Sequence, residues 1–150
     1  MDELKDLYRH NAWANDKVFD VALACEPPLL EGVAETLQHL ARVEHAYLAM
    51  MEQRQPEDRE QFLTHDVPWL REHLQQLGRG YLHLLETVTA EALQRDLQIP
   101  WFDFPVSVRD GLLQVLTHSA QHRSQVLSWL SDRAVQTPDL DYVLMLREAR

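Results

Sequence analysis

The sequence predicts an all-α protein: a four-helix bundle with a long crossover before the fourth helix and a short helix near the C-terminal end. Glycine and proline are sparse, at 4 and 7 of 150 residues, and they gather at a few positions. Between them, apolar residues recur at spacings of three and four, which is the period of an amphipathic helix. Four such segments, each about 22 to 25 residues long, are typical of a bundle.

The first two helices are predicted over residues 2–25 and 32–53. One face of the first helix is apolar, with Asn11 and Asn15 as polar interruptions. The two prolines after Glu26 end this helix, because proline has no backbone N–H to donate within a helix. The polar stretch QRQPEDREQ, which closes the second helix, is predicted to be a loop.

The third helix is predicted to begin after Asp66 and to reach about Val88. Asp66 suits the N-cap, since its side chain can accept hydrogen bonds from the first turn, and Pro68 suits a position that needs no donor. Gly78 and Gly80 weaken the middle of this helix by about 1 kcal/mol each relative to alanine. They do not end it.

Residues 89–107 form a long connection, because the helical period is lost there and two prolines and three aromatic residues occur. We expect a short turn of helix and a rudimentary extended pair around Ile99 and Val106. The aromatic stretch of Trp101 and its neighbours leads into the fourth helix.

The fourth helix is predicted over Val108–Ser131. Ser107, with Asp110 three residues later, resembles a capping box at its start. A short last helix, predicted over Asp139–Glu148, follows a proline.

The chain is predicted to be one domain over residues 1–150, since 45% hydrophobic residues at this length can form one core. A single cysteine, Cys25, excludes an intramolecular disulfide framework and suits a small buried position. No apolar run approaches the roughly 20 residues of a membrane span. The N-terminal MDELKDLYRHN lacks the apolar stretch of a secretory signal. We therefore expect a cytoplasmic protein without a membrane partner.

The formal net charge is -10, from 24 acidic and 14 basic residues. This charge opposes binding to phosphate backbones, and the sequence contains no cluster of lysine and arginine that would offset it. Nucleic-acid binding is therefore not expected.

The most informative feature is a histidine pair, His118 and His122, within the run LLQVLTHSAQHRSQVLSWL. One helical turn points both imidazoles the same way, which suggests half of a metal site. With eight histidines in the chain, about 0.4 such pairs arise by chance, so the pair alone is a weak signal. The alternative is a set of core histidines that hydrogen-bond to their neighbours.

A helical bundle builds a metal site from facing helices, so a third ligand should come from another helix. His39 is the best candidate, because it lies within the apolar pattern TLQHLARV of the second helix. His45 follows six positions later, about 120° around the helix from His39. His10 could line the same pocket from the first helix. The remaining histidines are His65, in a loop, and His73 and His83 on the third helix. None of them has an obvious partner histidine in the sequence.

The absence of two known motifs excludes two kinds of metal site. No histidine has a glutamate three residues before it, which excludes the Glu-x-x-His pattern of di-iron bundles. Ser119 follows His118, so the H-E-x-x-H pattern of zinc proteases is absent as well. Three imidazoles suit Zn, Ni, Fe, Co or Cu and leave at least one coordination position open. We expect Zn or Ni first, with Fe, Co or Mn as alternatives.

An open position on a divalent ion lowers the pKa of a bound thiol, which favours a lyase or transferase reaction with an external thiol. The same position could activate water for hydrolysis, and the residues leave both reactions open. Arg42 and Glu44 are the nearest groups that could orient a ligand or substrate, and the alternative for each is a solvated helical charge. The sequence identifies no catalytic residue, and we expect a small-molecule substrate.

Aromatic residues have two interpretations. Tryptophans in helices and loops usually belong to a core or an interface. Trp101, Phe102 and Phe104 could instead wall a pocket, because they directly precede the helix with the histidine pair.

The segments LYRHNAWANDKV, TLQHLARVEHAYL and LLQVLTHSAQHRSQVLSWLSDRAVQTPDLDYVLML resemble the DinB/YfiT-like superfamily of predicted metalloenzymes, and the resemblance spans nearly the whole chain. It implies a metal triad made of a histidine on the second helix and the H-x-x-x-H pair on the fourth. These positions are His39, His118 and His122 in this sequence.

The chain departs from the family pattern at two places. The family usually has Arg-Gly-Gln after the last ligand, whereas this chain has Arg123, Ser124 and Gln125, which suggests different helix packing there. The tryptophan that is common after the first ligand is here Tyr47, at the expected pocket wall. Neither departure removes a ligand.

The resemblance also implies a function. Members of the superfamily include a mycothiol-dependent isomerase and bacillithiol S-transferases, and the DinB branch is named for induction by DNA damage. We therefore expect a metal-dependent S-transferase or isomerase that uses a low-molecular-weight thiol, and a homodimer, since relatives often pair. A metal-dependent hydrolase is one alternative. A non-catalytic, stress-associated metal-binding or interaction module is another.

Overall fold

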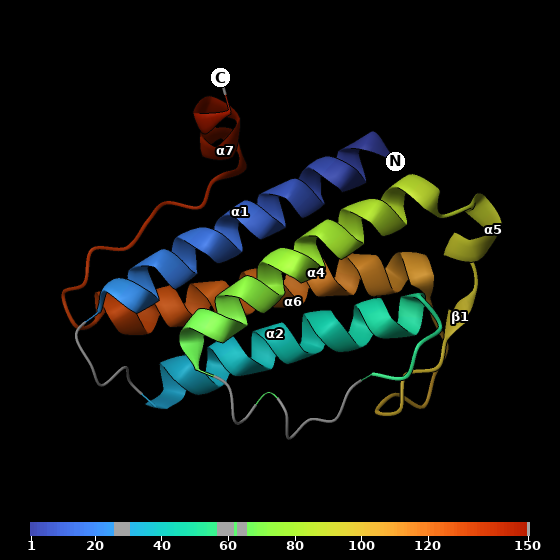
Figure 1. Ribbon diagram of the computed structural model, residues 1–150, viewed down its shortest axis with the longest axis horizontal. Coiled ribbons are helices and arrows are strands. Elements are labelled where there is room, and N and C mark those ends of the chain that lie inside the picture. Colours follow the sequence, from blue (N-terminus) through green and yellow to red (C-terminus); the bar gives the residue numbers. More distant parts are fainter. Residues whose placement is uncertain (26–30, 57–61, 63–65, 150) are drawn as a thin grey trace.

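The computed structural model describes residues 1–25, 31–56, 62 and 66–149. It is an all-α helical bundle, as predicted, with almost no sheet (Figure 1). The predicted helix-ending prolines, the second part of the QRQPEDREQ loop and His65 lie outside the described residues. The long helices are α1 (Asp2–Ala24), α2 (Glu31–Met51), α4 (Val67–Thr87) and α6 (Val108–Ser131).

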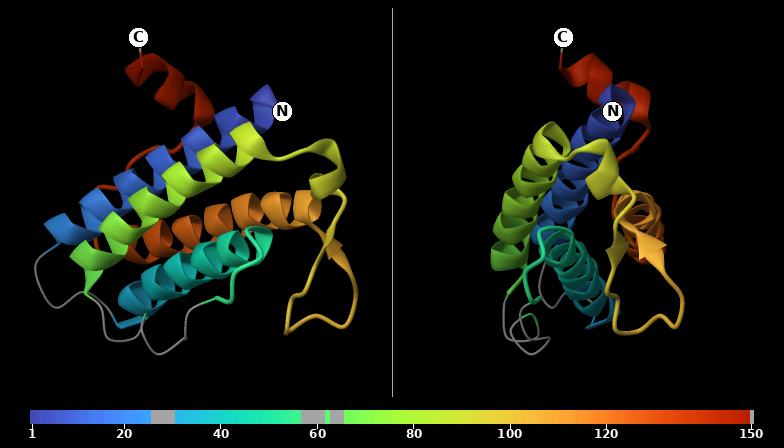
Figure 2. Two further views of the ribbon diagram at one scale, coloured as in Figure 1. Left: turned by 45° about the vertical axis from the view of Figure 1, so that its right-hand side comes forward. Right: turned by 90° about the vertical axis from the view of Figure 1, so that its right-hand side faces the viewer.

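Each long helix packs against two of the other three. Helices α1 and α2 lie at opposite corners of the bundle, and both pack against α4 and α6. The end-on view in Figure 2 shows the four helices around one central core. In Figure 1, α1 and α6 run in one direction, and α2 and α4 run in the other. Because α2 packs directly on α6, residues from these two helices can form a shared site.

The helix starts follow the predicted capping residues. The Asp66 side chain accepts from the backbone N–H of Trp69, and the Ser107 hydroxyl accepts from the backbone N–H of Asp110 at 3.1 Å. Ser107 also donates to the Asp110 carboxylate at 2.6 Å, so the two side chains contact each other directly. These caps satisfy backbone donors that the first turn of a helix leaves without partners.

Two glycines in α4 allow neighbouring helices to approach closely. A Cβ atom at Gly78 would lie 3.1 Å from the Ala12 Cβ of α1, and one at Gly80 would lie 2.7 Å from the Leu48 Cδ2 of α2. The sequence identified these glycines only as weak points of the helix. Their missing side chains instead let α4 pack closely on both neighbours.

The long connection between α4 and α6 contains the predicted turn of helix and extended pair. The turn is α5 (Ala90–Leu93), and β1 (Asp96–Leu97) pairs antiparallel with β2 (Val106–Ser107). Val106 is in the pair, opposite Leu97, but the prediction for Ile99 is wrong. The carbonyl of Ile99 accepts from the backbone N–H of Phe102, so Ile99 begins a turn and its side chain is buried in the core.

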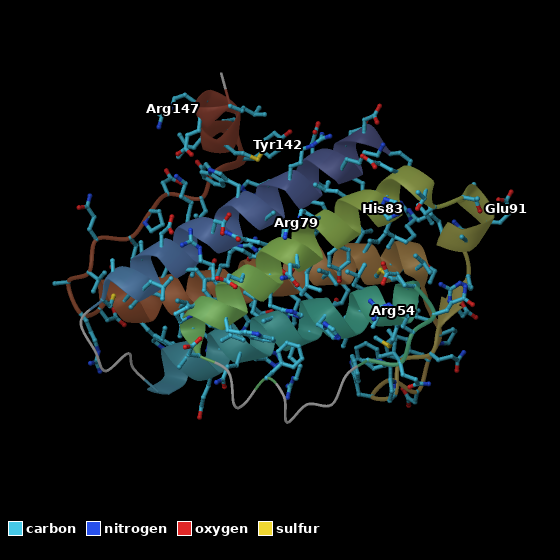
Figure 3. All side chains as sticks on the ribbon, viewed as in Figure 1. Arg54, Arg79, His83, Glu91, Tyr142 and Arg147 are labelled. Carbon is cyan, nitrogen blue, oxygen red and sulfur yellow. The ribbon has the colours of Figure 1, made fainter. Side chains whose placement is uncertain are left out.

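The C-terminal segment returns to α1. Helix α7 (Tyr142–Glu148) begins three residues after the predicted start, because the Asp139 carboxylate accepts from the backbone N–H of Asp141 in a local turn. The indole of Trp13 donates to the Glu148 carboxylate at 2.9 Å, which ties α7 to α1. Tyr142 lies at the end of α7 that is nearer to α1 (Figure 3).

The core is made of apolar side chains from all four long helices. Contacts among these side chains determine which face of each helix is turned inward. No helix in the described part of the chain is long and apolar enough to cross a membrane. Cys25 is only partly buried, so the prediction of a buried position is wrong, and its thiol donates to the carbonyl of Val21. The largest fully buried apolar side chains include Tyr8, Phe19, Leu37, Leu40, Tyr47, Phe62, Leu70, Tyr81 and Leu112.

Candidate metal centre

Three histidine side chains from two neighbouring helices meet at one point. His39 lies on α2, and His118 and His122 lie one turn apart on α6. The Nε2 atoms of His39 and His122 each lie 3.1 Å from the Nε2 atom of His118. All three side chains offer a ligand nitrogen within 4.8 Å of the others. The structure thus brings the predicted triad together.

The donor set fits a divalent transition metal. Zinc–nitrogen bonds of about 2.0–2.1 Å in a tetrahedral arrangement separate the ligand nitrogens by about 3.3–3.4 Å. The two Nε2–Nε2 distances of 3.1 Å therefore need only a small outward shift. Three imidazoles leave a fourth position for water or a substrate. The cluster could hold a metal ion, and imidazole donors are compatible with several metals.

His118 is the central residue of the cluster. Burial, together with repulsion from His122 and His39, lowers the pKa of His118 to about 4. The imidazole is therefore neutral at pH 7, as metal ligation requires. Its Nδ1 atom is buried and has no hydrogen-bond partner among the described residues. Its Nε2 atom, in contrast, faces the other two rings.

Two side chains contact the outer nitrogens of the triad. Nη2 of Arg42 lies 3.1 Å from Nδ1 of His39, and Oε1 of Gln125 lies 3.2 Å from Nδ1 of His122. Because a carbonyl oxygen only accepts, His122 donates from Nδ1 to Gln125, and its Nε2 keeps the lone pair that a metal needs. The Gln125 contact is of the kind that orients a metal-binding imidazole, whereas the guanidinium of Arg42 can only donate to Nδ1 of His39.

A pocket of about 480 Å³ opens beside the triad. His39 and His118 form part of its wall, together with the cationic side chain of Arg42. Aromatic side chains form much of the remainder: Tyr47, Phe62, Trp101 and Phe102. The predicted aromatic wall is confirmed for Trp101 and Phe102, whereas Phe104 is 57% exposed and stacks on Phe102.

A comparison with known protein families matches residues 1–149 to the DinB family. The chain belongs to the DinB family. A comparison with curated proteins finds no match. The DinB match covers essentially the whole chain and includes all three histidines. Family membership and the histidine cluster together are compatible with a metal-binding enzyme.

The two departures from the DinB pattern have different consequences. Tyr47, in place of a tryptophan, lies at the pocket wall as expected. Ser124, in place of a glycine, is exposed on α6. The difference in helix packing suggested for this position stays a prediction.

A buried polar network lies next to the triad. Oε1 of Glu44 accepts from Asn11 Nδ2 at 2.9 Å, Asn15 Nδ2 at 3.1 Å and Ser119 Oγ at 2.7 Å. Arg123 donates from Nη1 to the side-chain oxygens of Asn11 and Asn15, at 2.6 and 2.7 Å. The two asparagines thus bridge a buried anion and a buried cation. Burial lowers the pKa of Arg123 to about 10, and the charge of Glu44 opposes this shift.

The network was visible in the sequence only as polar residues on apolar faces. Asn11 and Asn15 are four residues apart on α1, as are Ser119 and Arg123 on α6, and each of the latter follows a histidine of the triad. Glu44 is 1% exposed, so its alternative interpretation as a solvated charge is wrong. Arg42 is partly buried beside His39, so the same interpretation is wrong for it.

Two other histidine predictions are wrong. His73 has a partner: its Nε2 lies 3.0 Å from Nδ1 of His45, which also lines the pocket. The His73 ring stacks on Trp69, with ring centroids 4.8 Å apart. His10 does not line the pocket. Its Nε2 lies 2.7 Å from the carbonyl of Leu140, because the face of α1 that bears His10 meets the C-terminal segment.

Proposed function

We propose that this protein is a divalent-metal-dependent enzyme in which His39, His118 and His122 bind the ion and a low-molecular-weight thiol reacts with an apolar electrophile. The observation that supports this proposal most strongly is the convergence of three Nε2 atoms beside an aromatic pocket. Membership of the DinB family agrees with it. Zinc and nickel suit the three imidazoles best.

The metal would hold the thiol as its nucleophilic thiolate. The residues of this chain would position the metal ligands and line the pocket in which the reaction takes place. Gln125 orients His122, and the burial of His118 keeps its imidazole neutral. Trp101, Phe102 and the other aromatic side chains give an apolar electrophile a surface on which to pack.

The reaction proposed is a transfer of sulfur to carbon. The thiolate sulfur forms a bond to an electrophilic carbon, and the leaving group departs with the electron pair of the bond that breaks. The thiol proton passes to solvent when the thiolate forms. An isomerase of this class would instead add the thiolate and later expel it.

A conjugation assay tests this function. Protein loaded with zinc or nickel is mixed with glutathione and 1-chloro-2,4-dinitrobenzene, and formation of the thioether is followed by absorbance. We expect turnover that requires metal and disappears in His118→Ala. His83→Ala is the matched control, because His83 is exposed on α4 and lies outside the pocket lining (Figure 3).

The other outcomes identify the alternatives. Metal-dependent cleavage of 4-nitrophenyl acetate without thiol consumption would indicate a hydrolase. Metal binding without turnover of any thiol or ester would indicate the non-catalytic module.

The family resemblance also suggests a homodimer, which light scattering of the purified protein tests directly.

A further inference from the structure

Tyr47 is a buried tyrosine whose hydroxyl has no acceptor in the described part of the chain. Two other buried tyrosines do have acceptors. Tyr8 donates to the carbonyl of Leu112 at 2.9 Å, and Tyr81 donates to the carbonyl of Glu44 at 2.6 Å. Since a buried polar group without a partner costs free energy, the hydroxyl of Tyr47 calls for a partner from outside the protein.

The ring of Tyr47 is held in place at the wall of the pocket. It packs over Gly111 of α6, where an added Cβ atom would lie 3.4 Å from Tyr47 Cδ1. It also meets the ring of Trp101 edge-on, with ring centroids 6.1 Å apart. Tyr47 lines the cavity, and its hydroxyl is not sealed from solvent. A molecule in the pocket can therefore reach this hydroxyl.

Tyr47 shares the pocket with two histidines of the triad, His39 and His118. Tyr47 follows His39 by eight residues on α2, and Gly111, beneath the ring, precedes His118 by seven on α6. Because α2 and α6 run in opposite directions (Figure 1), both steps lead the same way, by about two helical turns. Helical side chains lean toward the N-terminus of their helix, which for Tyr47 is the direction of His39.

We propose that Tyr47 is a further catalytic residue, whose hydroxyl donates a proton to the oxygen of a neutral epoxide as the thiolate sulfur attacks the epoxide carbon. This inference rests on the proposed function and identifies the class of electrophile. The wall of the pocket favours a neutral molecule, because burying a charge against apolar side chains is costly. These side chains include Val43, Ala46, Phe62 and Phe102.

The opening of an epoxide needs a proton donor of this kind. The sulfur forms a bond to one ring carbon, the bond from that carbon to oxygen breaks, and its electron pair stays on the oxygen. Burial raises the pKa of Tyr47, so the phenol is protonated at pH 7 and can donate. An alkoxide is a stronger base than a phenolate, so the proton passes to it. Tyr47 then takes from solvent the proton that the thiol released.

Other polar side chains of the pocket suit this role less well. Gln114 is exposed, and its amide does not release a proton to a ligand. The guanidinium of Arg42 is not deprotonated in proteins. His45 has its Nδ1 atom 3.0 Å from Nε2 of His73, and its own Nε2 is sealed from solvent. Tyr47 combines an acidic proton with access to the cavity.

Binding to the metal-free protein tests the hydroxyl without any reaction. Acetophenone offers a neutral oxygen, and ethylbenzene has a similar shape without one. Calorimetry should show that Tyr47→Phe binds acetophenone about 2- to 13-fold more weakly than wild type, as expected for one neutral hydrogen bond, and binds ethylbenzene equally well. Tyr142→Phe is the matched control, because Tyr142 lies on α7 (Figure 3), outside the pocket lining.

Kinetics of the zinc-loaded protein with glutathione test the proton transfer. Styrene oxide and benzyl chloride have the same ring, but only styrene oxide develops charge on an oxygen. Tyr47→Phe should lower kcat for styrene oxide by about 10²–10³-fold, as does the loss of one donor to a developing oxyanion, and should change KM far less. It should leave kcat for benzyl chloride unchanged. The variant should also unfold at the same urea concentration as wild type, because its missing hydroxyl had no protein acceptor.

Each contrary result has a distinct meaning. Equal losses of kcat for styrene oxide and benzyl chloride would show that Tyr47 only shapes the pocket, which overturns the inference. Equal binding of acetophenone to wild type and Tyr47→Phe would overturn it as well. Turnover of benzyl chloride without styrene oxide would overturn the epoxide class and leave the proposed function intact. Wild-type protein that turns over neither electrophile would overturn the proposed function and the catalytic role of Tyr47 together.

Discussion

Replacing Glu44 by glutamine is expected to destabilise the protein strongly, although the two side chains have the same shape. The Glu44 carboxylate is 1% exposed and accepts three hydrogen bonds on one oxygen. It is also the anion that balances the buried Arg123 through Asn11 and Asn15. Glu44→Gln keeps an oxygen that can accept, but it removes the charge.

The magnitude follows from these contacts. A hydrogen bond to a charged group contributes about 1.5–3 kcal/mol and a neutral one about 0.5–1.5 kcal/mol. Each of the three bonds to Glu44 therefore loses about 1 kcal/mol, and the buried Arg123 loses its counter-charge. We expect a decrease of about 3–4 kcal/mol in the free energy of unfolding. With a urea m-value of about 2 kcal/mol/M, the midpoint falls by about 1.5–2 M.

Urea unfolding of the metal-free protein, followed by circular dichroism, measures this change. Glu35→Gln is the matched control, because Glu35 is exposed on the same helix and should shift the free energy by less than about 0.5 kcal/mol. Adding Arg123→Gln to Glu44→Gln should cost less than the sum of the single changes, since the uncompensated cation is then absent. Equal effects of Glu44→Gln and Glu35→Gln would refute the reasoning.

Two further predictions concern the triad. The pKa of His118 is about 4 in the folded protein against 6.5 ordinarily, so the unfolded chain binds more protons between these values. The stability of the metal-free protein should therefore fall as pH decreases from about 6.5 to 4, by about 1–2 kcal/mol after allowance for the solvent that reaches this ring. His118→Asn should reduce that dependence in urea titrations at pH 7 and 4.5, and an unchanged dependence would argue against it. Gln125→Leu should weaken zinc binding about tenfold in chelator competition, because His122 loses its orienting partner. Ser124→Ala is the control, and equal affinities of the two variants would contradict this role.

The helices and their starts could be predicted because apolar spacing and capping residues act within a few residues of one another along the chain. Apolar spacing identified the long helices, and Asp66 and Ser107 identified two starts through side-chain contacts within one turn. The extended pair was less well placed, since Ile99 lies at a turn whose geometry depends on the residues around it.

The triad was predicted from a local pair and a family resemblance together. The spacing of His118 and His122 puts them on one face, but nothing in the spacing alone identifies His39 as the partner. The structure brings the three together because α2 packs on α6.

The remaining site residues depend on contacts between helices that the sequence does not reveal. Glu44 and Arg123 are residue types that are mostly exposed, so their burial was not expected. The pairing of His45 with His73 joins α2 to α4. Helical periodicity predicts which face of a helix is buried, but it does not predict which other helix packs against that face. His10 was misplaced for the same reason, because its face of α1 meets the C-terminal segment.

The most direct test of the metal centre is elemental analysis of untagged protein after dialysis against zinc. Wild-type protein should retain about one equivalent, and the His39→Ala, His118→Ala, His122→Ala variant should retain none while keeping its helical circular dichroism. Wild-type protein without metal, or a triple variant that retains a full equivalent, would contradict the assignment of these three histidines as ligands.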